Sequence, residues 1–240
     1  MIESAATPAA ESHPGSPVAG PLRQVLGPLE RRRGQCRHRQ RRPHSVTPSA
    51  DNSIHVSGVV DYSLVKPTLT VSTPGSSVAI KASCQLSLFQ GCSVRISVEV
   101  PASADITASS GSGDVTAANL GNVTLRTASG DVRATSITGV TSLRADSGDI
   151  TATGLTSSDV TANDDSGTVS LDFTAVPRRL AVQDSSGDVS VSLPPGDQAY
   201  NVAAHSDSGN TRIGVPTDPS SANTISVSVA SGDVQIEPNG

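Results

Sequence analysis

Aspartate residues recur at one position of a short phrase that is repeated between Ser112 and Asp233. Each of the seven copies reads Ser-Gly and then a polar residue. That residue is Asp in five of them: Asp114, Asp131, Asp149, Asp188 and Asp233. Further aspartates stand directly before the Ser, at Asp146, Asp165 and Asp207. Carboxylates gathered by a repeat can bind Ca²⁺, and two of them about 5–10 Å apart can cleave a glycosidic bond.

The same aspartates also suit a structural role. Asp is common beside a turn Gly because its carboxylate accepts hydrogen bonds from nearby backbone. Thr168 and Asn210 interrupt the main series, and the GGxGxD phrase of calcium-binding repeats is absent. We therefore predict turn chemistry, keep a weak calcium column as the alternative, and expect no cofactor.

A catalytic interpretation has one preferred location. Asp164 and Asp165, with Asp146 or Asp184 of a neighbouring repeat, are the first candidates for a glycosidase acid pair. No aromatic platform for a sugar ring stands nearby, since the chain has two Phe, two Tyr and no Trp. A Ser nucleophile is disfavoured because the GxSxG motif is absent and His205 is the single histidine of the repeats. We predict no catalytic residue.

The spacing of the phrase predicts a β-solenoid. Successive copies begin 17, 18, 19, 20, 22 and 23 residues apart, a period typical of coiled repeats. Apolar and polar residues alternate on both sides of each Ser-Gly, as in two half-buried strands separated by a corner. Glycine supplies the positive φ that such a corner needs. The corner glycines are Gly113, Gly130, Gly148, Gly167, Gly187, Gly209 and Gly232.

We therefore expect an all-β fold, a parallel β-solenoid over residues 102–240 with two strands per coil of 17–23 residues. Parallel crossovers favour a right-handed coil. Stacked coils bury a thin core of small aliphatic residues, which suits a chain with 35% hydrophobic and 2% aromatic residues. So few aromatic residues fit poorly with nucleic-acid binding, and we expect none on the folded domain.

The N-terminal residues differ in composition from the repeats. Residues 1–50 carry eight Arg and three Glu, whereas residues 51–240 carry nine Lys or Arg and nineteen Asp or Glu. Residues 1–50 show no alternating pattern, and we expect a disordered basic, Pro-rich tail, or a truncated or mis-started N-terminus. Residues 51–101 are expected to form strands that cap the first coil. No signal peptide or transmembrane segment is apparent.

Three cysteines occur, at Cys36, Cys84 and Cys92. Cys84 and Cys92 enclose a short loop and are the candidate disulfide, which would imply an oxidising compartment. The alternative is two reduced cysteines at strand ends. A zinc site is disfavoured because no second Cys pair exists.

Insertions lengthen the later repeats at one corner. They cover residues 174–179, 193–198 and 214–223, where proline prevents further strand pairing. Insertions on one face of a solenoid often form its binding face. Arg178, Arg179 and Tyr200 are therefore candidate surface residues.

Residues 51–240 resemble a known bacterial family. The Ser-Gly-Asp-Val repeats, the segment CSVRISVEVPASADI, the Cys84 and Cys92 pair, and the LPPG and VPTDPSS corners are similar to a family of β-strand-repeat domains. That family carries an adhesin label and is classed as a domain of unknown function. The resemblance implies an envelope-associated solenoid, often with an N-terminal membrane helix that this sequence lacks, and it implies no catalytic residue.

We expect a non-enzymatic β-solenoid of the cell envelope or extracellular space that acts as an adhesin or interaction module. Its expected partner is an envelope polysaccharide, a surface protein or another copy of itself. The alternatives are a carbohydrate-active β-helix enzyme and a scaffold that polymerises through exposed coil ends.

Overall fold

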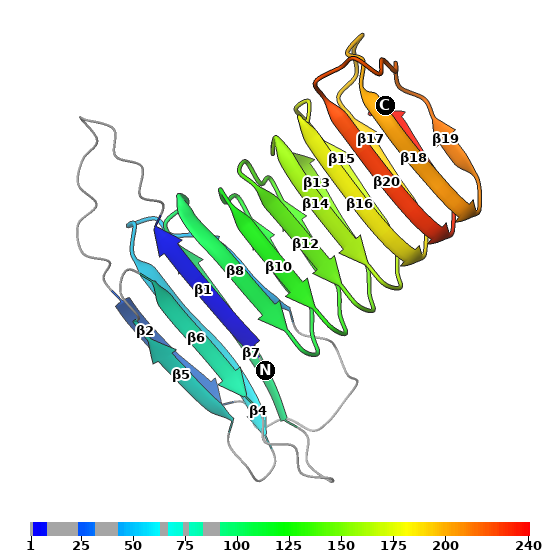
Figure 1. Cartoon of the computed structure of the whole chain (residues 1–240). Helices are drawn as coiled ribbons and strands as arrows, with labels where there is room; N and C mark the ends of the chain where they lie inside the picture. Colours follow the sequence, from blue (N-terminus) through cyan, green and yellow to red (C-terminus); the bar gives the residue numbers. More distant parts are fainter. Residues whose placement is uncertain (1, 9–23, 32–42, 63–66, 74–76, 84–91) are drawn as a thin grey trace, which may run out of the picture.

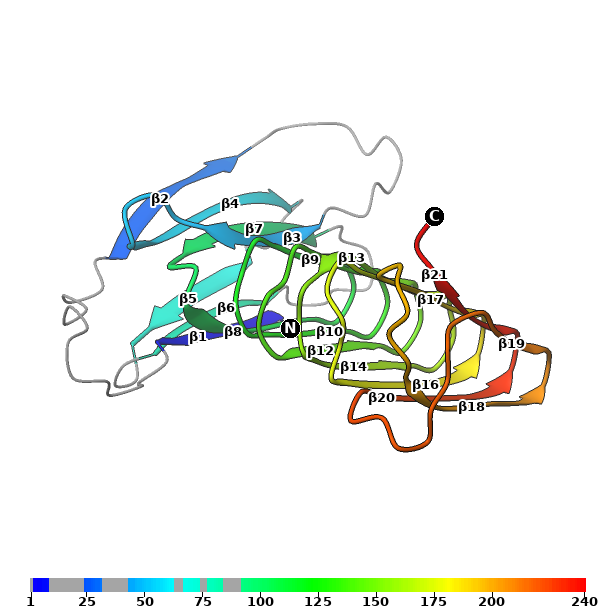
Figure 2. The same cartoon turned by 90° about the horizontal axis from the view of Figure 1, so that it is seen from above.

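The computed structural model describes residues 2–8, 24–31, 43–62, 67–73, 77–83 and 92–240. These residues form strands and turns and contain no helix. Two sheets lie face to face in a rod, with the early strands at one end and the last repeats at the other (Figures 1 and 2). The predicted parallel β-solenoid is confirmed.

Sheet A has ten strands and sheet B has eleven. In spatial order, sheet A contains β18 (Asn201–Ser208), β20 (Thr224–Ser231), β16 (Arg179–Ser186), β14 (Asp159–Asp164), β12 (Thr141–Ala145), β10 (Val123–Thr127), β8 (Ala104–Ser110), β1 (Ile2–Pro8), β6 (Val78–Ser83) and β5 (Thr68–Ser72). In the same direction, sheet B contains β19 (Thr211–Ile213), β21 (Val234–Pro238), β17 (Val189–Leu193), β15 (Val169–Phe173), β13 (Ile150–Leu155), β11 (Val132–Thr135), β9 (Val115–Ala118), β3 (His44–Pro48), β7 (Cys92–Val100), β4 (Ile54–Tyr62) and β2 (Gln24–Arg31).

Each coil of the repeat region gives one strand to each sheet. Equivalent positions stack in parallel, so that Leu125 of β10 lies beside Ala108 of β8 and Leu143 of β12. All three side chains are buried, whereas the residues before and after each of them along its own strand face outward. This is the period-two alternation that the sequence predicts.

A further buried column closes the core at the corner that leads from sheet B back to sheet A. The sequence analysis did not include this column, although its members recur at the interval of the repeat and three of them end the strands β13, β15 and β17. The column consists of Leu120, Ile137, Leu155, Phe173 and Leu193, each at most 1% exposed.

Three strands lie in the described parts of residues 1–50. They are β1, β2 and β3, and two of them cover the first coil of the repeats. β1 runs antiparallel to β8, and β3 runs parallel to both β9 and β7. A strand of five residues such as β3 is too short for its alternation to stand out beside Arg- and Pro-rich sequence.

His44 shows how closely β3 is packed. Its side chain is buried, and its Nδ1 accepts a hydrogen bond from the backbone N–H of Ile96 at 3.2 Å. Burial lowers the pKa of this imidazole to about 4. The ring is therefore neutral at ordinary pH and serves as a hydrogen-bond acceptor inside the fold.

The last two coils do not follow the order of the sequence. The final strands, β20 and β21, lie between the coil of β16 and β17 and the coil of β18 and β19 (Figure 1). Along the sequence the outermost coil comes first. The chain then turns back and forms the coil that lies between it and the rest of the rod. We name β20 and β21, with the residues that follow them, the inserted coil (224–240), and β18 and β19 the terminal coil (201–213).

Hydrophobicity explains this order. The inserted coil places five aliphatic side chains in the core, each at most 1% exposed: Ile225, Val227, Val229, Val234 and Ile236. At the matching positions the terminal coil has Val202, Ala204, Ser206, Thr211 and Ile213. The end of a solenoid leaves one side of a coil in water, so the more polar coil is favoured there.

Two isoleucines at matching positions test this coil order. Ile213 and Ile236 are register partners, but Ile236 is fully buried and Ile213 is 41% exposed. We expect Ile236→Ala to lower the free energy of unfolding by about 2–4 kcal/mol, and Ile213→Ala by no more than about 1 kcal/mol. Urea denaturation of the two variants measures both values. Coils stacked in sequence order would reverse the ranking.

Candidate functional site

The aspartates after the corner glycines form a hydrogen-bonded ladder. Oδ1 of each carboxylate accepts a hydrogen bond from the backbone N–H of the equivalent residue in the next coil, which is a charge-assisted contact. The donor and acceptor pairs are Asp131 to Asp114 (3.1 Å), Asp149 to Asp131 (3.2 Å), Thr168 to Asp149 (3.0 Å), Asp233 to Asp188 (2.8 Å) and Asn210 to Asp233 (2.8 Å). The predicted turn chemistry therefore acts between coils rather than within one turn.

The corner glycines bring these carboxylates close to the next backbone. Six of the seven have positive φ, between 136° and 158°, and Gly209 of the terminal coil is the exception. The N–H of Gly130, for example, donates to the carbonyl of Ser147 in the next coil at 3.0 Å. A Cβ built on Gly148 would overlap the carbonyl oxygen of Gly130. Glycine is thus required both by conformation and by the approach of the neighbouring coil.

The ladder bears on the calcium alternative. Within the described ranges, no group of three or more His, Cys, Asp or Glu side chains is placed to hold a metal ion. Calcium needs six to eight oxygen ligands, and here one oxygen of each ladder carboxylate already accepts a backbone N–H. The geometry therefore favours the structural role of the ladder.

Asp164 and Asp184 form a carboxyl pair inside the solenoid. They are register partners on β14 and β16 and are 3% and 6% exposed. Oδ1 of each accepts a backbone N–H two residues later, from Ser166 at 3.3 Å and from Ser186 at 3.1 Å. In the part of the chain that the structure describes, neither Oδ2 has a hydrogen-bond partner. The pair therefore lacks the contacts that would stabilise two negative charges.

This environment raises the pKa of both carboxyl groups. Burial, reinforced by the negative charge of Asp184, raises the pKa of Asp164 to about 6. Burial also raises the pKa of Asp184. A carboxyl group with such a pKa beside a second one could act as a general acid. However, both side chains lie in the core, where a sugar ring would not reach them.

The other acids proposed for catalysis lie on the surface. The guanidinium of Arg144 lies 3.1 Å from Oδ1 of Asp146 and 3.6 Å from Oδ2 of Asp165. On the terminal coil, Asp207 lies 2.7 Å from Nε2 of His205. Exposed pairs of this kind contribute little to stability, so their charges are available to a partner. The structure thus places Asp164 beside Asp184 in the core, whereas Asp146 and Asp165 lie on the surface.

The outer side of sheet A carries two parallel rows of polar side chains. Strand register places the members of each row next to one another. The first row is Thr107, Thr124, Ser142 and Thr161, and the second is Ser109, Arg126, Arg144, Asn163 and Gln183. We name these residues the sheet A face. Their strands run side by side along the rod in Figure 1, and neighbouring side chains repeat about every 4.8 Å.

One of the three residues predicted to lie on the surface with the insertion loops is buried. Tyr200 is only 1% exposed. Its N–H donates to the carbonyl of Pro216 at 3.0 Å, and its carbonyl accepts from the N–H of Asp218 at 2.9 Å, so it joins two insertions. Arg178 and Arg179 are exposed, and Nε of Arg179 lies 3.0 Å from Oδ1 of Asp159. The longer loops allow the chain to return and form the inserted coil.

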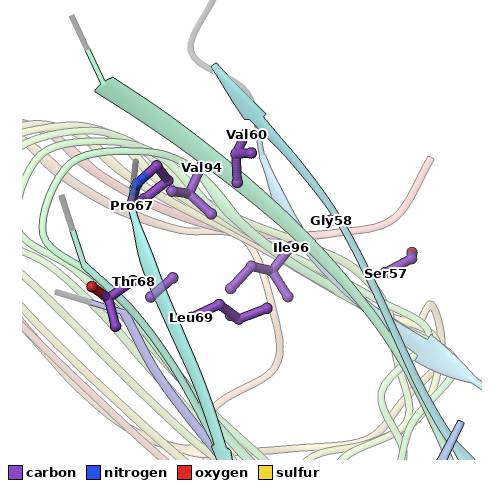
Figure 3. A pocket seen from close by; sticks show the side chains of 9 residues that line it. Ser57, Gly58, Val60, Pro67, Thr68, Leu69, Val94 and Ile96 are labelled. Carbon is purple, nitrogen blue, oxygen red and sulfur yellow. The ribbon is translucent and has the colours of Figure 1, made fainter. Parts of the chain in front are cut away.

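An apolar recess opens between the two sheets near the N-terminal end of the rod (Figure 3). Val60, Val94 and Ile96 of sheet B face Pro67 and Leu69 of sheet A. The lining contains no acid, base or metal ligand, so it offers no group for catalysis.

The candidate disulfide cannot be placed in the structure. Cys92 begins β7, but Cys84 and Cys36 lie outside the described residues, so the pairing stays a prediction.

Residues 44–237 match the family described as Toastrack DUF4097, a domain of unknown function with β-repeat architecture. The chain belongs to the Toastrack DUF4097 family. The predicted membership in a β-strand-repeat family is thereby confirmed. The Toastrack match begins at the first residue of β3, which agrees with the pairing of this strand to the first coil. No curated protein and no solved structure matches the chain.

Across the ranges that the structure describes, no helix of the Toastrack chain is long and apolar enough to cross a bilayer.

Removal of one ladder carboxylate should weaken the contact between two coils. Asp149→Ala leaves the N–H of Thr168 without its acceptor, and we expect the free energy of unfolding to fall by about 0.5–1.5 kcal/mol. Asp149→Asn keeps an acceptor oxygen and should lose less. Urea denaturation measures both, and added Ca²⁺ should change neither. Stabilisation of the unmodified chain by Ca²⁺ that disappears in Asp149→Ala would instead support the calcium column.

The buried carboxyl pair should make stability depend on pH. The raised pKa of Asp164 means that its contribution is fully present below its ordinary value of 3.8 and is lost as pH rises through about 6. Asp164→Asn removes one ionisable group, so we expect the variant to be more stable than the unmodified chain by about 1–3 kcal/mol at neutral pH and similar to it in acid. Urea denaturation at the two pH values provides the measurement. Equal pH dependence in both proteins would contradict a raised pKa of the buried Asp164.

Proposed function

We propose that this Toastrack protein is a non-enzymatic interaction module of the cell envelope that binds an extended polymer along the sheet A face. The observation that supports the proposal is the pair of polar rows, which repeat with the coil spacing across several strands. A flat, periodic surface suits a long partner with repeating groups better than a small molecule, which needs a concave site. An envelope polysaccharide is such a partner.

The arginines indicate which polysaccharide fits best. Arg126 and Arg144 are register partners on β10 and β12, so two guanidinium groups stand on neighbouring strands. Arg144 already pairs with Asp146 and Asp165, so the guanidinium of Arg126 is the more available of the two to a bound anion. Arginine also binds carboxylate and phosphate groups through paired hydrogen bonds, while the adjacent Thr and Ser hydroxyls can bond to sugar hydroxyls. An acidic polysaccharide therefore matches this face.

The burial of the acids supports a role without catalysis. The ladder carboxylates bind backbone N–H groups of neighbouring coils, and the Asp164 and Asp184 pair lies in the core. The remaining candidates, Asp146 and Asp165, pair with an exposed arginine. The envelope location is part of the proposal and is based on the family resemblance and the candidate disulfide.

A carbohydrate-active enzyme is the second candidate. The observation in its favour is the raised pKa of Asp164 beside a second carboxyl group. It would require the coils around β14 and β16 to open and admit a sugar, because the pair is closed to solvent in this structure.

One sedimentation experiment separates the two functions. The full chain is mixed with insoluble acidic cell-wall polysaccharide, and both the bound protein and the sugar released into the supernatant are measured. We expect retention without release, and we expect Arg126→Ala/Arg144→Ala to weaken binding by about tenfold or more, or about 1.4 kcal/mol.

Arg133→Ala is the matched control, because Arg133 is an exposed arginine on the outer side of sheet B. Its binding should stay within about twofold of the unmodified chain. Retention that is unaffected by the double substitution would rule out the sheet A face as the binding surface. Sugar release that Asp164→Asn abolishes would establish the enzyme instead.

A further inference from the structure

The inserted coil (224–240) fills a slot between two coils that precede it in the sequence. β20 pairs in parallel with β16 on one side and with β18 on the other, and β21 pairs with β17 and β19 in the same way. Among the described strands, β18 and β19 pair only with this insert. The terminal coil is therefore joined to the rest of the rod through the last residues of the chain.

The corner of the insert makes the same contacts between coils as the corners of the earlier repeats. The N–H of Gly187 donates to the carbonyl of Ser231 at 2.9 Å, and the N–H of Gly232 donates to the carbonyl of Ser208 at 3.0 Å. The N–H of Asp233 donates to Oδ1 of Asp188 at 2.8 Å, as in the ladder of earlier coils. None of these contacts requires that the insert and the slot belong to the same molecule.

On its N-terminal side, one loop connects the insert to the terminal coil. Residues 214–223 leave the terminal coil and return to the start of β20, and all but Val215, Ser221 and Asn223 are exposed. They include Pro216 and Pro219, which prevent the loop from pairing as a strand.

We propose that the slot also accepts the inserted coil of a second copy of this chain, which gives a coil-exchanged dimer. The exchanged and closed forms share the strand pairing within the slot, and they differ in the path and the hydrogen bonds of residues 214–223. An exchange of identical elements is therefore a low-cost route to association, and its extent rises with protein concentration. The partner is a second copy of this chain, because the segment that fills the slot belongs to this sequence.

Cysteine pairing between two differently labelled copies tests the proposal. Ser190 of β17 and Gln235 of β21 are register partners on the outer side of sheet B. Their strands are neighbours about 4.8 Å apart, within the range that a disulfide spans. Copies of the full chain carrying Ser190→Cys are mixed with copies carrying Gln235→Cys at high concentration. All copies also carry Cys36→Ala, so that this cysteine does not react.

We expect a disulfide-linked heterodimer that increases with concentration and whose linked peptides contain positions 190 and 235. The control mixture combines Ser170→Cys with Ser190→Cys, which are register partners on β15 and β17 in the middle of the chain. Coils there are connected on both sides and should not exchange. We expect at least about tenfold more heterodimer from the first mixture than from the control.

A chain carrying both Ser190→Cys and Gln235→Cys must form the bond within one molecule, which confirms the geometry. A second mixture, Gln183→Cys with Ser228→Cys, makes the same test on sheet A, where these residues of β16 and β20 are also register partners. Heterodimer from both test mixtures supports exchange. Heterodimer no greater than the control, with efficient bonding inside the doubly substituted chain, overturns it.

Discussion

Close contact between the glycine corners of successive coils is the constraint on which the rest of the structure depends. A side chain at Gly148 would overlap the carbonyl of Gly130, and a side chain at Gly232 would overlap that of Gly187. With glycine present, each corner N–H reaches the carbonyl of the next coil. The strands on either side then align in parallel, in register except for a bulge between Ala152 and Leu155, and their inward residues stack into one core.

The close contact between corners also determines which charged groups bind backbone and which face solvent. The aspartate that follows each corner glycine lies within reach of the next backbone N–H, so its carboxylate joins two coils rather than facing a substrate. The inward position before the corner holds Asp164 and Asp184, where burial without a partner for Oδ2 raises the pKa of both carboxyl groups. The groups that remain exposed to a partner include the hydroxyl groups and arginines on the outer faces of the two sheets. A binding function on a flat face follows more readily than a catalytic one.

Much of this architecture could be predicted from the sequence, because glycine corners and alternating aliphatic residues repeat at a regular interval. The coil order could not, since the phrases at Ser208 and Ser231 fit the same corner equally well. The comparison of inward positions, such as Ser206 with Val229 and Thr211 with Val234, suggests which coil belongs inside. β3 was missed because its five residues carry too little pattern, and Tyr200 was placed on the surface because loop sequence does not show what packs over it.

A single methyl group added at a corner is the most direct test of this constraint. Gly148 has a φ of 136°, and its Cβ would meet backbone, whereas a Cβ on Gly214 would make only ordinary contacts, with Cγ of Glu237 nearest at 3.5 Å. We expect Gly148→Ala to lower the free energy of unfolding by about 2–4 kcal/mol and Gly214→Ala to change it by less than about 1 kcal/mol. Equal stability of the two variants in urea denaturation would show that the corners do not govern the stack.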